Sequence, residues 1–270
     1  MLLVALVTGG HAVAAQPAPT ATRRPSVVSA GTATMDHARF TAVLRQYVVR
    51  GFVDYDGFAR SPDFARYLDE LDRTRPETLT EDDQLAYWIN VYNAYTIQLI
   101  VQHQESASIR NIGRTLGLLR LKGPWSVPIV RAGGRRLSLD EVQHTVLGQQ
   151  FEEPRVHFAL SCGAMGCPPL RSDAYTGAAL LEQLEDQARH FMRDYPAQNR
   201  VEARSIWLSP VLLRARRDFG VTRADFLQAI APYVPEADQK RLLELRGPLH
   251  ESTFDWTLNS QAQAKRLRRW

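Results

Sequence analysis

The sequence TEDDQLAYWINVYNAYTIQL, at residues 80–99, decides the fold class. Thr80 followed by the acidic residues 81–83 is typical of a helix N-terminus, where a hydroxyl caps the first turn. Apolar and aromatic residues then recur every three or four positions, which predicts a long helix with one buried face. That face consists of Leu85, Trp88, Ile89, Tyr92, Thr96 and Leu99.

Shorter periodic segments surround this helix. Helical spacing and capping residues predict further helices over residues 36–51, 64–71, 138–147, 176–194, 209–217 and 222–233. Alternation and turn residues predict strands over residues 125–131, 135–137, 155–160 and 201–208, the first two joined in a hairpin at Gly133-Gly134. Many helices with few, scattered strands indicate a mostly helical α+β fold with a small antiparallel sheet.

Composition excludes several classes of protein. Of 270 residues, 44% are hydrophobic and 23% are charged, which argues against disorder, collagen and coiled coils. Two cysteines are too few for a disulfide-stapled miniprotein. No run of about 18 apolar residues follows the N-terminus, so we expect no membrane span after signal cleavage. A net charge of +4 does not indicate a nucleic-acid partner.

The N-terminal residues have the composition of an export signal. Residues 1–14 are apolar and end in a small-x-small pattern, which predicts a signal peptide. Residues 15–35, rich in Pro, Ala, Ser and Thr, predict a flexible tether, and residues 261–270 predict a solvated basic tail. A periplasmic or secreted protein is therefore expected, in a compartment where disulfides persist.

The loop that contains both cysteines is the first candidate site. Cys162 follows the predicted strand 155–160 and precedes glycines that allow a ligand to approach the backbone, so it is a candidate nucleophile. Alternatively, Cys162 and Cys167 form a structural disulfide, and a permanent bridge excludes the nucleophile. Redox work by the pair is a third possibility, although the spacing is not C-x-x-C.

Two histidines are candidate bases. His144 lies beside the apolar face of its predicted helix, where it is either a surface residue or a base at the rim of a cleft. His157 lies in the predicted strand, where parity places it on the face opposite Cys162 and disfavours a direct pair.

Asn90 and Asn93 are unusual in an aromatic-rich helix, because asparagine is a poor helix former and is costly to bury unpaired. They either anchor the helix to a loop through hydrogen bonds, or orient a catalytic imidazole and an oxyanion. No phosphate-binding, dinucleotide, HExxH or GxSxG motif is present, and no cofactor is expected. A metal site at His157, Cys162 and Cys167 matches no common zinc spacing.

Six segments together resemble the bacterial family called domain of unknown function 547. They are Gly51–Tyr55, Ala86–Ala94, Leu137–His144, Arg155–Pro168 and Asp218-Phe219 with the closing Asp255–Asn259. The resemblance spans about residues 36–260, which implies a single domain, and it matches family positions to Asn90, Asn93, His144, His157 and Cys162. Two positions depart from the family pattern: Gln143 replaces an acid, and Gly148 replaces an arginine.

Two functions are compatible with these residues. In a thiol-dependent hydrolase or acyl transferase, Cys162 is the nucleophile. Papain-like and transglutaminase-like enzymes are the analogues, and their folds are candidates for this chain. His144 or His157 is then the base, and Asn93 or Asn90 orients it. In a non-catalytic exported binding module, the Cys162–Cys167 bridge is structural and aromatic residues line a groove. A peptide or a glycan is the expected partner in both cases.

Overall fold

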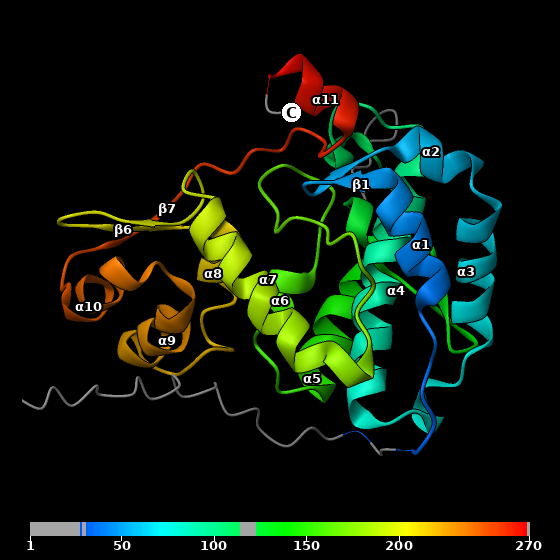
Figure 1. The fold of residues 1–270 in the computed structure, drawn as a ribbon, viewed down its shortest axis with the longest axis horizontal. Helices are drawn as coiled ribbons and strands as arrows, with labels where there is room; N and C mark the ends of the chain where they lie inside the picture. The colour runs from blue at the N-terminus through cyan, green and yellow to red at the C-terminus, as the bar shows by residue number, and fades with distance from the viewer. Residues whose placement is uncertain (1–27, 29–30, 114–122, 269–270) are drawn as a thin grey trace, which may run out of the picture.

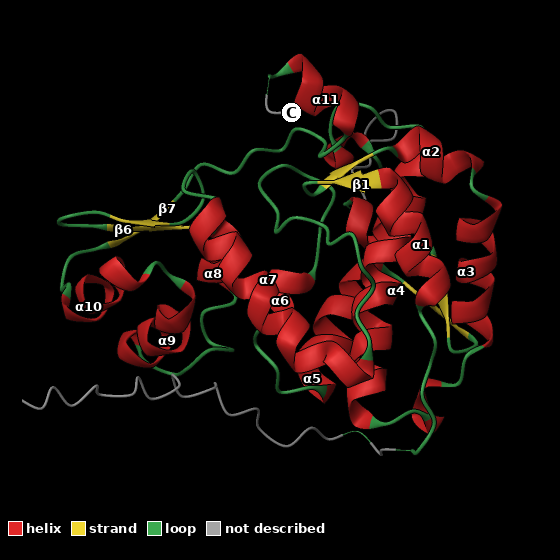
Figure 2. Ribbon diagram, viewed as in Figure 1, coloured by secondary structure: helices red, strands yellow, loops and turns green. Residues whose placement is uncertain are grey.

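The computed structural model describes residue 28, residues 31–113 and residues 123–268 of the chain (Figure 1). The predicted signal peptide and most of the predicted tether lie outside the described residues. Within them the fold is mostly helical with small sheets, as predicted (Figure 2).

The helices follow the sequence signals closely. The α-helices are α1 (Ala38–Tyr47), α2 (Tyr55–Arg60), α3 (Pro62–Arg73), α4 (Glu81–Gln102), α5 (Gly148–Gln150), α6 (Val156–Ala159), α7 (Leu180–Asp194), α8 (Pro210–Arg214), α9 (Arg223–Ile230), α10 (Glu236–Glu244) and α11 (Gln261–Arg266). A π-helix, η4 (Glu141–Leu147), and five short 3-10 helices accompany them: η1 (Pro76–Thr78), η2 (Ile109–Asn111), η3 (Pro124–Ser126), η5 (Gly177–Ala179) and η6 (Ala231–Tyr233).

The strands form three small sheets in the described part of the chain. β1 (Val48–Val49) pairs antiparallel with β2 (Phe52–Val53), and β3 (Val130–Ala132) with β4 (Arg135–Leu137). β5 (Arg200–Val201) is antiparallel to β6 (Ile206–Leu208), which is parallel to β7 (Leu249–Glu251). The first helix was predicted to reach Gly51 but ends at Tyr47, because Arg50 and Gly51 have positive φ and turn the chain into the β1–β2 hairpin.

Helix α4 is the centre of the larger core. The hydroxyl of Thr80 caps it by accepting a hydrogen bond from the amide of Asp83. Seventeen of its 22 residues are buried, so it is enclosed on all sides rather than on the predicted single face. In Figure 1, α1, α2 and α3 lie on one side of α4, and α6 and α7 lie on the other.

A second, smaller core lies in the C-terminal part of the chain. Phe158 on α6 and Phe191 on α7 pack there against aromatic residues that follow α8 and lie on α9 and η6. The other buried residues of α6 belong to the larger core. This short helix therefore joins the two cores.

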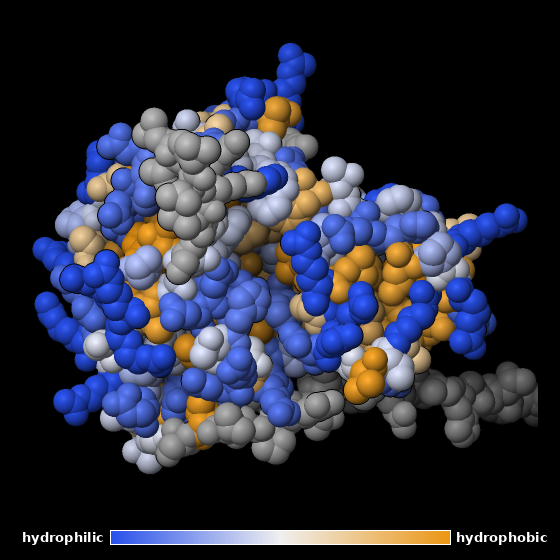
Figure 3. Space-filling model, turned by 180° about the vertical axis from the view of Figure 1, so that it is seen from behind, coloured by the Kyte–Doolittle hydropathy of each residue, from blue (hydrophilic) through white to orange (hydrophobic). Residues whose placement is uncertain are grey.

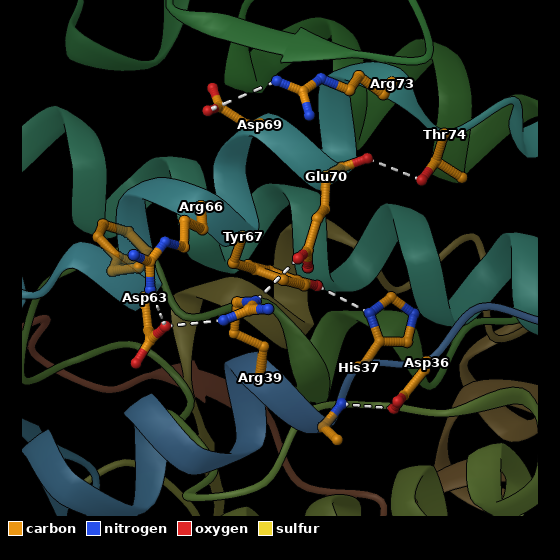
Figure 4. A network of polar contacts seen from close by, with 12 residues as sticks. Asp36, His37, Arg39, Asp63, Arg66, Tyr67, Asp69, Glu70, Arg73 and Thr74 are labelled. Carbon is orange, nitrogen blue, oxygen red and sulfur yellow. Dashed lines mark hydrogen bonds and ion pairs between the residues drawn. The ribbon is translucent and has the colours of Figure 1, made fainter.

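A polar network fastens α1 to α3 (Figure 4). The Arg39 guanidinium contacts Asp63 and Glu70 at 2.7 and 2.8 Å. Beside it, Nδ1 of the buried His37 lies 2.8 Å from the hydroxyl of Tyr67. Burial lowers the pKa of His37 to about 4, while the charges of Asp83 and Asp36 oppose this effect. The network therefore places a neutral imidazole inside the fold.

The C-terminal helix α11 packs on the β1–β2 hairpin region, so the predicted solvated tail begins with an ordered helix. Its Ala264 is buried, whereas Lys265 and Arg266 are exposed. Seen from behind, the surface is mostly hydrophilic, with hydrophobic residues in separate patches (Figure 3). Among the described residues, no helix has the length and apolar character needed to cross a membrane.

Candidate functional site

A cavity of about 450 Å³ lies where the two cores meet, and three of the predicted site residues line it. Cys162, His144 and His157 reach it from three separate segments of the chain. The other lining residues lie on helix α4, at positions 125, 140, 143 and 160, and within the segments 210–218 and 254–256. The cavity is thus the meeting point of the cysteine loop, η4, α6 and α8.

Cys162 and Cys167 form a disulfide, with their Cα atoms 5.7 Å apart. Cys162 is half-buried and lines the cavity, whereas Cys167 is buried. The amide of Ala164 donates a hydrogen bond of 3.4 Å to Sγ of Cys167. The structure therefore contains the bridge that the sequence left as an alternative, and of its two cysteines Cys162 lines the cavity.

The segment 255–259 holds the cysteine loop in place. The amides of Met165 and Gly166 donate to the carbonyls of Thr257 and Asp255, at 2.8 and 2.9 Å. The amide of Asn259 donates in turn to the carbonyl of Gly163 at 3.2 Å. Gly163 has φ +82°, a conformation that favours glycine. The loop is therefore fixed at three residues between the two cysteines.

His157 lies on the short helix α6 and not on a strand. Residues 155–160 were predicted to be a strand, and this prediction is wrong: their alternation comes from a single helical turn between the two cores. The parity argument against a pairing of His157 with Cys162 fails with it. Both residues line the same cavity.

The imidazole of His157 is oriented by a carboxylate. Its Nε2 lies 2.7 Å from Oδ2 of Asp218, which leaves Nδ1 without a described partner. The hydrogen bond from His157 lowers the pKa of Asp218, and the charges of His157 and His144 act in the same direction against burial. An oriented imidazole of this kind is what a general base requires.

His144 is exposed on η4 at the edge of the cavity, as expected for a rim residue. The predicted capping box opens this helix: the Ser138 hydroxyl accepts from the amide of Glu141, whose carboxylate accepts from the amide of Ser138. Single π-helical turns are frequent at functional sites. Gln143, the residue that departs from the family pattern, also lines the cavity.

Asn90 and Asn93 act on the backbone rather than on the cavity. Nδ2 of Asn93 donates to the carbonyl of Ala159, and Oδ1 accepts from the amide of Ser161. Asn90 makes the same two bonds with Tyr175, at 2.7 and 3.0 Å. These bonds engage Nδ2 and Oδ1 of each side chain with the backbone, and neither asparagine lines the cavity. The hydrogen-bond role is the one observed, and Asn93 anchors the residues just before Cys162.

A buried ion pair lies in the chain directly before α6. Arg155 contacts Glu153 at 2.6 Å, and both side chains are 2% exposed. Arg155 also contacts Glu185 on α7 at 3.5 Å. Since Arg155 immediately precedes α6, the pair fixes the backbone that carries His157.

Aromatic residues form the opposite wall of the cavity. Trp125 contacts Trp256, which packs on Phe254 with ring centroids 4.3 Å apart. The guanidinium of Arg110 lies over Trp256, 4.9 Å from the ring centroid. Nε1 of Trp125 is buried without a hydrogen-bond partner among the described residues. This wall offers flat apolar surface to a ligand.

Asp218 and Arg214 were missed as site residues, whereas the tryptophans were expected only in general terms, as aromatic residues that line a groove. Asp218 is in a segment that carries the family resemblance, but nothing local indicates that it reaches His157, 61 positions earlier. Arg214 lines the cavity from the end of α8. Among the described residues, no group of three or more His, Cys, Asp or Glu side chains is arranged to hold a metal ion.

Comparison with known proteins gives one match. No curated protein and no solved structure matches the chain, so a papain-like or transglutaminase-like fold stays a prediction. Residues 76–192 match the family described as "Protein of unknown function, DUF547", and they include Asn90, Asn93, His144, His157 and Cys162. Over residues 76–192 the chain therefore matches the DUF547 family.

Proposed function

We propose that the chain is a thiol-dependent acyl-transfer enzyme, a hydrolase or a transferase, that works when the Cys162–Cys167 bridge is reduced. One observation carries the proposal: a single cavity contains Cys162, His144 and the His157–Asp218 pair. A nucleophile, a base and a group that orients the base are the parts that acyl transfer needs.

The roles follow from the contacts. In the reduced chain, the Cys162 thiol gives its proton to Nδ1 of His157, and the thiolate attacks the substrate carbonyl. A carbon–sulfur bond forms, and the bond to the leaving amine or alcohol breaks as His157 returns the proton to it. Water or a second acceptor then cleaves the thioester, again with His157 as base. Asp218 stabilises the imidazolium throughout.

The variant Cys167→Ser tests this proposal, because it frees Cys162 without a reductant. We expect its Cys162 to react with iodoacetamide at neutral pH about tenfold faster than a model cysteine, since a nearby imidazole lowers the pKa of a thiol. Adding His157→Asn to this variant removes the acceleration. Cys162→Ser, which leaves Cys167 as a buried thiol, is the matched control.

An activated ester extends the test to the whole reaction. With p-nitrophenyl acetate, Cys167→Ser gives a burst of p-nitrophenol equal to the protein concentration and an acetyl group on Cys162. If the burst needs His144 and not His157, the assignment of the base is wrong. If Cys162 reacts no faster than a model cysteine, the enzymatic proposal is wrong.

The disulfide and the aromatic wall favour a second function, an exported binding module for a peptide or a glycan. The bridge then remains closed in the working protein, and Trp125 and Trp256 contact the ligand. Intact-mass measurement of protein purified without reductant discriminates the two functions. A fully bridged chain that binds ligand but stays unreactive after reduction supports the module.

The proposed location is the periplasm or the exterior of the cell, because residues 1–14 have the pattern of a signal peptide. Mass spectrometry of the exported chain tests this, with cleavage close to Ala14 expected. An intact N-terminus in the cytoplasmic fraction contradicts it.

A further inference from the structure

A second cavity, of about 860 Å³, adjoins the first one. Phe254 and Trp256 line both cavities, so the segment that carries them forms the partition. The disulfide loop reaches both as well, with Cys162 in the first cavity and Met165 in the second. An extended ligand that passes the partition therefore contacts both cavities and passes beside Cys162.

The second cavity has the polar character of a site for a hydrogen-bond donor. Gln198, which lines it, is 6% exposed, and its Oε1 is buried without a hydrogen-bond partner among the described residues. An unpaired buried acceptor costs free energy that a ligand N–H recovers. Two carboxylates, Asp194 and Asp255, also line this cavity, and no Lys, Arg or His does so in the described part of the chain. Asp194 lies 2.7 Å from Nδ1 of His190 at an exposed position, and Asp255 accepts from the amide of Thr257, so each would share its carboxylate with the ligand.

The first cavity has the opposite character. Arg214 lines it, and its closest carboxylate is that of Glu251, at a distance of 3.9 Å between two exposed side chains. The two carboxylates of this cavity are both engaged: Ser126 donates to Asp140, and His157 pairs with Asp218. The guanidinium of Arg214 is therefore the group best placed to receive an anion there.

We infer that the two cavities form one cleft for a short peptide with free termini, whose carboxylate lies at Arg214 and whose ammonium group lies beside Gln198, Asp194 and Asp255. The ligand crosses the Phe254–Trp256 partition in an extended form, with its backbone next to Cys162. The inference rests on the proposed function in one respect, which is that the first cavity is the reaction site. Binding alone tests it.

Calorimetric titration of the oxidised wild-type protein with tetra-alanine is the direct experiment. The ligand is used with free termini, with an N-acetyl group and with a C-terminal amide. An ion pair at a partly exposed site contributes about 1 kcal/mol, so each blocked terminus weakens binding about fivefold. Arg214→Gln removes the discrimination against the amide and leaves that against the acetyl group. Asp194→Asn has the converse effect, and Gln198→Met weakens binding of the free ammonium.

Arg216→Gln is the matched control, because Arg216 follows α8 closely but does not line the cavity. Equal effects of Arg214→Gln and Arg216→Gln overturn the inference, as does equal binding of the three peptides or no binding at about 10 mM. Tighter binding of chitotriose than of tetra-alanine also overturns it, in favour of a glycan. Because Cys162 stays bridged in this experiment, failure of the acyl-transfer chemistry leaves the result interpretable.

Discussion

The buried His37 makes the stability of the fold depend on pH. The variant His37→Asn removes this dependence, so comparison with the wild type measures it. His37→Asn keeps a polar atom near Nδ1, where the Tyr67 hydroxyl lies 2.8 Å away, but it cannot take up a proton. The wild-type imidazole is 1% exposed, and burial is the main cause of its lowered pKa.

The magnitude follows from the pKa of His37, which is about 4 in the folded chain against 6.5 ordinarily. Between these values the unfolded chain binds more protons, so the free energy of unfolding falls as the pH is lowered. Each pKa unit corresponds to about 1.4 kcal/mol, so the complete loss is about 3 kcal/mol. About 2 kcal/mol of it is lost by pH 5, and the contribution is fully present above pH 6.5.

Urea unfolding followed by circular dichroism, at several pH values between about 7.5 and 4.5, measures this loss. The carboxylates that also titrate in this range are common to both proteins, so the difference between wild type and His37→Asn reports His37. His103→Asn, at an exposed position, is the control. Parallel curves for wild type and His37→Asn refute the reasoning, because they mean that His37 has the same proton affinity in both states.

Three further substitutions test the supports of the site. Arg155→Ala leaves Glu153 buried and unpaired, so it lowers the free energy of unfolding by about 3–5 kcal/mol in a urea titration, and a loss under 1 kcal/mol contradicts the assignment. Asn93→Ala leaves two buried backbone groups unpaired and lowers the free energy of unfolding by about 2–4 kcal/mol. In the Cys167→Ser background it also slows alkylation of Cys162. An unchanged alkylation rate shows that Asn93 does not position the loop. Thr222→Ala removes the cap of α9 and costs about 1 kcal/mol by thermal unfolding. Thr253→Ala, at an exposed position that begins no helix, is expected to be near neutral.

The helices were predictable because their signals are local. Thr80, Ser138 with Glu141, and Thr222 each cap the helix that follows them, as their positions predict. A cap acts within one turn of the chain, so its meaning does not depend on the tertiary fold.

The strand at residues 155–160 was mispredicted because burial on two sides produces alternation in a helical turn as well. Phe158 is buried in the smaller core and Val156 in the larger one, so both neighbours of His157 are apolar for reasons unconnected with a sheet. The ion pair of Arg155 also depends on groups brought together by tertiary packing. Periodicity over six residues cannot separate the two structures.

The identity of the site residues was partly predictable, and their geometry was not. Cys162, His144 and His157 were identified by residue type and by the family resemblance, and they line one cavity. Asp218 completes the site from a distant segment, and such a contact leaves no periodic or spacing signal in the sequence.

The contacts of Asn259 show at what stage of synthesis the site can be completed. Asn259 joins strand β2 to the cysteine loop, because its carbonyl accepts from the amide of Val53 while its own amide donates to the carbonyl of Gly163. During synthesis, Cys162 and Cys167 emerge long before Asn259 exists. Until residues 255–259 are made, the loop between the two cysteines lacks the hydrogen bonds to Asp255, Thr257 and Asn259 that fix its backbone in the folded chain.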